Sequence, residues 1–299
     1  MALSDNMRGA FLMAAGMTAF TVNDAFVKTL GGDVPLFQIL FLRGIGVTLG
    51  LLALSVALGQ LRLEQSRADW GLIGVRSLAE AFGAFFFVTA LFNMPIANVS
   101  AILQALPLTV ALGGALWLKE PLGWRRMTAI LVGFAGVLLI VRPGGADFNI
   151  FAVSALATVL CVTVRDLVVR RMSATVPSVL ISLSASVVVM TSAGAASIFV
   201  DWTPVSGRQG VMLGGATLSL IGGYIFSVAA MRVGEIGFVA PFRYTSLLVA
   251  LLIGVVFFDE VPRALTLVGA GIVVATGLFT LWRERQIRLR RRVIPDRIR

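Results

Sequence analysis

The sequence predicts an all-α membrane protein whose ten transmembrane helices form two inverted five-helix repeats. The first observation is composition: 58% of the 299 residues are hydrophobic and only 13% are charged, whereas soluble domains carry roughly 25% charged residues. The second is a series of apolar runs, each long enough to cross a bilayer. The third is an internal duplication, in which the second half repeats the first at a shift of about 140 residues.

Ten apolar runs of spanning length follow one another along the chain. They fall at about 8–29, 35–58, 70–92, 97–118, 123–141, 149–168, 177–200, 209–230, 237–258 and 264–282. The first run continues without a convincing cleavage site, so we expect a retained span rather than a signal peptide. Short breaks with Gly and Pro separate the runs, so neighbouring helices must be antiparallel and no soluble domain fits between them.

The duplication is clearest in the fourth and ninth runs. They read ANVSAILQALPLTVALGGALWLKEPL over 97–122 and GFVAPFRYTSLLVALLIGVVFFDEVP over 237–262. Each ends on a Glu near a Pro, at Glu120 and Glu260, and the segment 24–28 likewise aligns with 166–170. An odd number of spans per half turns the second half upside down, as in many secondary transporters. We therefore expect a first five-helix repeat over 1–145, a second over 146–282 and a basic cytoplasmic tail over 283–299.

The distribution of basic residues predicts the orientation. If the N-terminus is inside, 18 of the 25 Lys and Arg residues fall in cytoplasmic segments, eight of them after Leu281. This asymmetry places both termini in the cytoplasm. We therefore expect a multi-pass protein of the bacterial inner membrane, and its net charge of +10 to face anionic lipid rather than nucleic acid.

Composition also excludes several kinds of chemistry. The chain has one Cys and no His, which argues against an internal disulfide and against zinc or His-based catalysis. It has no P-loop pattern, so ATP is not the expected energy source. We expect no metal and no cofactor; the expected partners are a small-molecule substrate and membrane lipid, with a homodimer left open.

Several segments carry a family resemblance that extends over nearly the whole chain. They are AILQALPLTVAL, GWRRMTAILVGFAGVLLIVRPG, RDLVVRRMSATVPS and MRVGEIGFVAPFRYTSLL. With the ten spans, they resemble the EamA-like bacterial branch of the drug/metabolite transporter superfamily. The resemblance implies a central cavity formed mainly by the first four helices of each half, with the fifth helices peripheral. It also implies solutes as different as amino acids, riboflavin and S-adenosylmethionine.

The leading functional prediction is a secondary active transporter that moves a small metabolite by alternating access, with riboflavin uptake as one possibility. The alternative is an exporter of amino acids or related metabolites and drugs. A remote alternative is an intramembrane hydrolase with Asp24 and Asp166 as a dyad, but these residues are expected near opposite surfaces and no Gly-x-Gly-Asp segment is present. A receptor or scaffold would normally add a soluble signalling domain, for which there is no room.

The deepest acidic candidate is Glu80, which is expected about 15 Å from the inner surface at 1.5 Å per residue. Arg76 lies one turn earlier and could pair with it. Ionisable groups within spans usually face a cavity or each other. A fixed structural ion pair and a role in binding substrate or a proton both remain open.

Four further charged residues are gate candidates. Asp24 and Arg43 lie on adjacent spans at similar depths and could meet near the outer surface. Asp166 is the repeat mate of Asp24, and inversion places it near the inner surface beside Arg165. Matched gates are one interpretation, and ion pairs that hold helix ends together are the other.

The ninth span carries a polar pair, Arg243 and Tyr244, directly after Pro241. Proline removes a backbone donor and loosens the preceding turn, which can expose carbonyl groups to a ligand. Gln104 occupies the repeat position of Tyr244, so substrate binding is one hypothesis for this region and helix packing the other.

Overall fold

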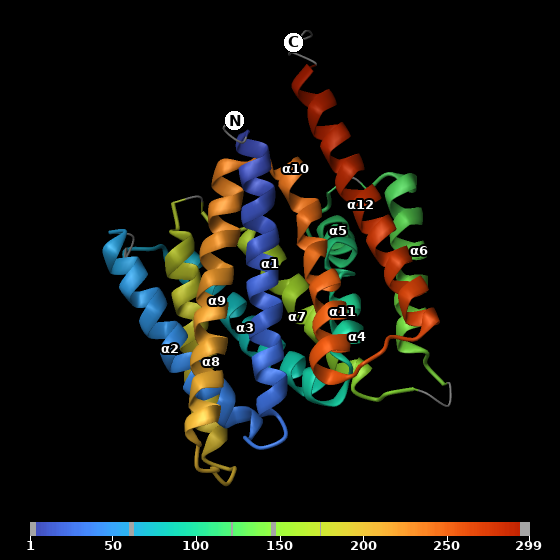
Figure 1. Ribbon diagram of the computed structural model, residues 1–299. Coiled ribbons are helices and arrows are strands. Elements are labelled where there is room, and N and C mark those ends of the chain that lie inside the picture. The colour runs from blue at the N-terminus through green and yellow to red at the C-terminus, as the bar shows by residue number, and fades with distance from the viewer. Residues whose placement is uncertain (1–3, 60–62, 121, 145–147, 174, 294–299) are drawn as a thin grey trace.

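The chain is built from helices throughout the residues that the structure describes, which are 4–59, 63–120, 122–144, 148–173 and 175–293 of this computed structural model (Figure 1). The helices are α1 (Asp5–Leu30), α2 (Leu36–Ala57), α3 (Arg67–Asn93), α4 (Ile96–Leu103), α5 (Leu106–Trp117), α6 (Trp124–Val141), α7 (Ala152–Val169), α8 (Ser178–Ser197), α9 (Gly207–Val233), α10 (Ile236–Val239), the 3₁₀ helix η1 (Ala240–Tyr244), α11 (Thr245–Phe258) and α12 (Ala264–Val293).

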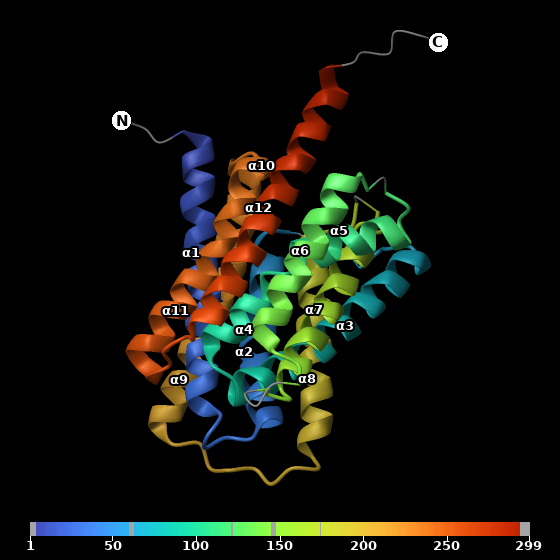
Figure 2. The same ribbon diagram turned by 90° about the vertical axis from the view of Figure 1, so that its right-hand side faces the viewer.

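Within these described residues, ten helical segments are long and apolar enough to cross a membrane. This confirms the predicted all-α membrane class and the ten spans. Both described ends of the chain lie at the same end of the bundle (Figures 1 and 2), as an even number of spans requires. We call this the termini end and the other the distal end.

Two spans are interrupted, the fourth between α4 and α5 and the ninth at η1. Each break has a proline next to it, Pro107 at the start of α5 and Pro241 within η1. Proline has no N–H to donate to the preceding turn, which favours the end of one helical piece and the start of another. The two breaks occupy equivalent positions in the two halves.

The last helix is longer than its apolar run, because α12 continues to Val293 and includes most of the segment expected as a basic tail. Arginine is a good helix former, so a helix can extend beyond the point where hydropathy ends. The remainder of that predicted tail, 294–299, lies outside the described residues.

Large apolar side chains cover much of the outside of the bundle. Ile198, Phe199, Leu218 and Phe257 are each more than 70% exposed. Exposed apolar side chains in this number are unfavourable in water but match the hydrocarbon of a bilayer.

The helices pair symmetrically when the two halves are exchanged. Helix α1 packs on α9, and its repeat mate α7 packs on α3. Helix α2 packs on α8, α4 on α11, and α6 on α12. This exchange pattern is the one expected of halves related by a two-fold axis.

The fifth helices of the two halves, α6 and α12, form an edge of the bundle (Figures 1 and 2). Their backbones meet at two glycines: a Cβ on Gly269 would lie 2.6 Å from the carbonyl oxygen of Gly136. Small residues permit this close approach where no hydrophobic effect drives helices together. The central space is therefore left to the other four spans of each half.

Candidate functional site

A charged network joins α3 to α7 inside the bundle. Glu80 accepts hydrogen bonds from Nη1 of Arg165 at 3.2 and 3.3 Å, and Arg76 approaches Glu80 at 3.6 Å. Arg165 also donates from Nε to Asp166 at 2.9 Å. The Glu80 and Arg165 side chains are 19% and 23% exposed. The structure thus brings together four candidates that the sequence placed in two separate sites.

A second polar group joins α1 to α2. Arg43 donates to the side-chain oxygen of Asn23 at 3.0 Å, and the Asn23 amide donates to Asp24 at 2.9 Å. Asp24 and Arg43 interact electrostatically, but Asn23 lies between them as a buried bridge. The expected meeting of the two helices therefore occurs through a neutral side chain, which the sequence analysis did not single out.

Tyr224 of α9 lies near both of these groups. Its charged neighbours are Glu80 and Arg165 of one network and Arg43 of the other. Its ring meets that of Phe20 edge to face at 5.4 Å. Tyr224 was not among the sequence candidates, although a tyrosine in the middle of an apolar helix, next to two glycines, is a recognisable signal.

Arg243 lies at the break of the ninth span, near the same network. It interacts electrostatically with Asp166 and Arg165, and its side chain is exposed. In the described part of the chain, no carboxylate lies within 4 Å of its guanidinium and no hydrogen-bond acceptor is in reach. Discontinuous helices at equivalent positions of two repeats commonly form the substrate site of a transporter.

The other two candidates in this region lie against protein. Tyr244 is buried, and its hydroxyl packs on Gly277 of α12. Gln104, also buried, donates to the Ser246 hydroxyl at 2.9 Å and so links the breaks of the fourth and ninth spans. These contacts favour helix packing for both residues over direct ligand contact.

An ion pair closes the distal end. Lys28 of α1 lies 3.0 Å from Glu260, which follows α11, and the two side chains are 11% and 17% exposed. Lys28 also donates to the carbonyl oxygens of Leu91 and Met94, and Glu260 accepts from the backbone N–H of Ile96 at 2.8 Å. The pair therefore ties together the ends of four spans.

A related ion pair occupies the termini end. Arg170 lies 3.0 Å from Glu120, and these side chains are 41% and 43% exposed. Arg170 is the repeat mate of Lys28, and Glu120 is the repeat mate of Glu260. The same interaction is thus present at both ends of the bundle, but it is buried at one end and open at the other.

The turns that carry Glu120 and Glu260 are built alike. The residue before each Glu, Lys119 or Asp259, has a left-handed backbone with φ of 56° or 53°. The N–H of each Glu bonds to the carbonyl six residues earlier, on Gly114 or Gly254. The repeat aligns these segments in the sequence, but the pairing of the glutamates with Lys28 and Arg170 becomes visible only in the structure.

The chain matches one family over its first half: residues 7–142 match the EamA-like transporter family. This half of the chain is therefore similar to the EamA-like transporters. Relatives named as transporters extend the similarity over most of the chain, and none of these names is that of an enzyme.

Three such relatives are about equally similar to this chain. An S-adenosylmethionine uptake transporter of Rickettsia conorii is 26% identical and covers 93% of both chains. A riboflavin transporter of Vibrio cholerae is 26% identical over 77% of this chain and 78% of its own length. A pseudopaline exporter of Pseudomonas aeruginosa is 26% identical over 93% of this chain and 97% of its own.

The fold also matches that of a solved protein structure. The two superimpose with a TM-score of 0.63 at 21% identity, covering 92% of this chain and 98% of the other.

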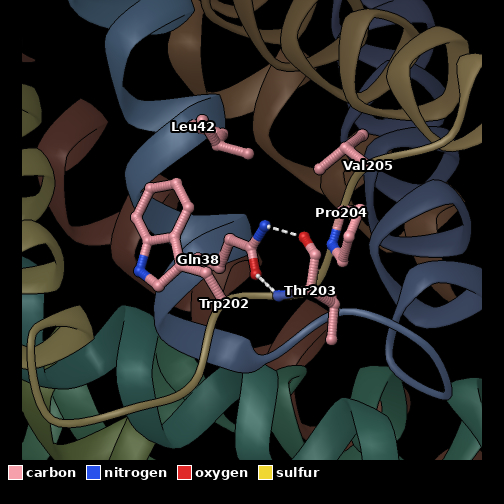
Figure 3. A pocket seen from close by; sticks show the side chains of 6 residues that line it. All are labelled: Gln38, Leu42, Trp202, Thr203, Pro204 and Val205. Carbon is pink, nitrogen blue, oxygen red and sulfur yellow. Dashed lines mark hydrogen bonds between the residues drawn. The ribbon is translucent and has the colours of Figure 1, made fainter.

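A separate cavity of about 590 Å³ opens at the distal end of the bundle, between the start of α2 and the α8–α9 connection (Figure 3). The Gln38 side chain donates to the Thr203 carbonyl oxygen at 2.8 Å and accepts from the Thr203 N–H at 3.1 Å. Its amide is thus used in fastening a loop, and the other lining side chains drawn in Figure 3 are mainly apolar. This cavity offers a solute few polar contacts.

Proposed function

We propose that this protein is a secondary active transporter that moves a small metabolite across the bacterial inner membrane by alternating access. Its two halves, 1–145 and 146–282, act as inverted five-helix repeats, and the termini end faces the cytoplasm. The charged network of α3 and α7, together with Arg243 at the break of the ninth span, forms the binding region.

The observation that carries this proposal is the unequal burial of two repeat-related ion pairs. The Lys28–Glu260 pair has side chains that are 11% and 17% exposed, and the Arg170–Glu120 pair has side chains that are 41% and 43% exposed. If the halves exchange conformations, the buried and open pairs exchange as well. That is the behaviour of two gates that close in turn, with the distal gate closed in the present conformation.

This assignment of the gates differs from the sequence-based one. Asp24, Arg43, Arg165 and Asp166 lie with the central groups, where they contribute to the binding region. The residues that differ between the two ends are Lys28, Glu120, Arg170 and Glu260.

For the substrate, we propose an amino-acid-derived metabolite of the size of S-adenosylmethionine, since a relative with that named substrate covers 93% of the chain. Riboflavin uptake is a second candidate, because a relative is named as a riboflavin transporter. Another relative is an exporter, so export of amino-acid derivatives stays the alternative direction.

Counterflow tests the proposal directly. The purified full chain is reconstituted in liposomes that are preloaded with unlabelled S-adenosylmethionine or riboflavin, and entry of the labelled solute is followed. We expect transient accumulation of at least one solute with the wild-type protein. If neither solute accumulates, the proposal is contradicted.

Matched variants test the gates in the same assay. Glu260→Gln and Glu120→Gln keep a hydrogen-bond acceptor but remove the charge that each ion pair needs. Both are expected to slow counterflow, because each destabilises one of the two closed states. Glu64→Gln, on an exposed loop residue, serves as the control and should leave counterflow unchanged.

A further inference from the structure

We propose that the transported solute carries a carboxylate and that Arg243 binds it. This proposal rests on the transport function above and names the chemical class of its substrate. It is carried by the balance of charges inside the bundle and by the surroundings of one side chain.

Between the two end ion pairs, the described spans hold four arginines and three carboxylates. They are Arg43, Arg76, Arg165 and Arg243, with Asp24, Glu80 and Asp166. Arg76 and Arg165 are matched by Glu80 and Asp166 through direct contacts. Arg43 is matched by Asp24 through Asn23. One positive charge, that of Arg243, has no counterpart.

The surroundings of Arg243 leave its donors available. The side chain of Arg243 is exposed. By contrast, the side chain of Arg76 is buried and donates a hydrogen bond to the Ile181 carbonyl oxygen. Asp166, the acid with which Arg243 interacts electrostatically, is already bonded to Arg165. Uncompensated charge within a membrane is costly and commonly marks a substrate pathway.

The guanidinium group favours a carboxylate as the missing partner. Its planar fork of N–H donors matches two carboxylate oxygens at once. One carboxylate carries the single negative charge that would offset the charge of Arg243 locally, whereas a phosphate with two charges would exceed it. The position of Arg243 in η1, between the helices α10 and α11 of an interrupted span, places it where transporters commonly bind solute groups.

The test compares solutes that differ only in the carboxylate. Affinities of the purified full chain for S-adenosylmethionine, the twenty standard amino acids, their decarboxylated analogues and riboflavin are measured by thermal stabilisation. We expect binding of at least one carboxylate and binding of its decarboxylated analogue that is roughly 10- to 100-fold weaker, as for loss of a charge-assisted hydrogen bond.

Variants of Arg243 connect this preference to the residue. Arg243→Gln should weaken binding of the carboxylate by the same factor and leave the analogue unaffected, and Arg243→Lys should fall between. Neither variant strands a bonded partner, so both are expected to fold. Arg208→Gln, which removes an exposed charge at the start of α9, is the control and should bind as the wild type does.

Three results would overturn the proposal. The first is that the decarboxylated analogues or riboflavin bind as tightly as the solutes with a carboxylate, and the second is that no solute with a carboxylate binds. The third is that the Arg243→Gln protein binds these solutes with the affinity of the wild type. Counterflow of riboflavin without binding of any carboxylate would overturn the role of Arg243 and leave the transport function standing. Absence of counterflow for all of these solutes would instead overturn the transport function.

Discussion

Replacing Glu80 with Gln is expected to destabilise the folded protein, because Glu80 is held by two arginines. The carboxylate accepts two hydrogen bonds from Arg165 and lies 3.6 Å from Arg76. The amide cannot offset either charge. Removal of one member of a buried ion pair costs about 3–5 kcal/mol, because the remaining charge is left uncompensated.

The structure indicates the lower part of that range. In the variant, Arg165 would keep its 2.9 Å contact with Asp166. The side chains of Glu80 and Arg165 are also partly exposed, at 19% and 23%, so the stranded charge is not fully desolvated. We therefore expect a loss of about 3 kcal/mol in the free energy of unfolding. A double-mutant cycle with Arg165→Gln should recover part of the loss, because the double variant no longer strands that arginine.

The assay is reversible unfolding in detergent, together with the yield of folded protein and counterflow of the folded fraction. Glu64→Gln is again the matched control. A Glu80→Gln protein with wild-type stability that exchanges solute but no longer concentrates it against a pH gradient would refute the reasoning. That outcome would make Glu80 a proton carrier, which is the alternative left open by the sequence.

Three further predictions concern packing, a helix start and topology. Gly269→Ala should lower the free energy of unfolding by about 1–3 kcal/mol, because the added Cβ meets Gly136. Gly271→Ala on the same helix is the control and should leave stability unchanged, because its Cβ would meet open space. Equal effects of the two substitutions would contradict the α6–α12 contact. Asp69→Ala should lower the free energy of unfolding by about 1–3 kcal/mol. The Asp69 carboxylate accepts hydrogen bonds from the N–H and hydroxyl of Ser173, and with Ser66 it caps the start of α3. An unchanged unfolding midpoint would exclude this role. Reporter fusions after Arg67 and Arg126 should report the cytoplasm and a fusion after Arg208 the outside, and the reverse result would exclude the proposed orientation.

The sequence was sufficient for features that depend on local composition. The spans follow from hydropathy, and the interruption of the ninth span follows from Pro241. The contact between Arg76 and Glu80 also follows, because residues four apart on a helix are neighbours.

Contacts between distant helices could not be predicted in the same way. Glu80 meets Arg165 because α3 packs on α7, and nothing in either segment specifies that packing. Tyr244 faces Gly277 rather than the polar interior, which depends on the rotation of a 3₁₀ turn. The pairing of Lys28 with Glu260 lies between these cases, since the repeat alignment marked both residues and their mates but did not show that each pair joins the two halves.

Accessibility of the centre from the two sides of the membrane tests alternating access most directly. Arg243→Cys in a Cys161→Ser background is treated with a membrane-impermeant thiol reagent in right-side-out and inside-out vesicles. We predict that the introduced cysteine is labelled faster from the cytoplasmic side. Adding Glu260→Gln should increase labelling from the outside, whereas adding Glu120→Gln should not. Equal labelling rates from both sides that neither variant changes would contradict two gates that close in turn.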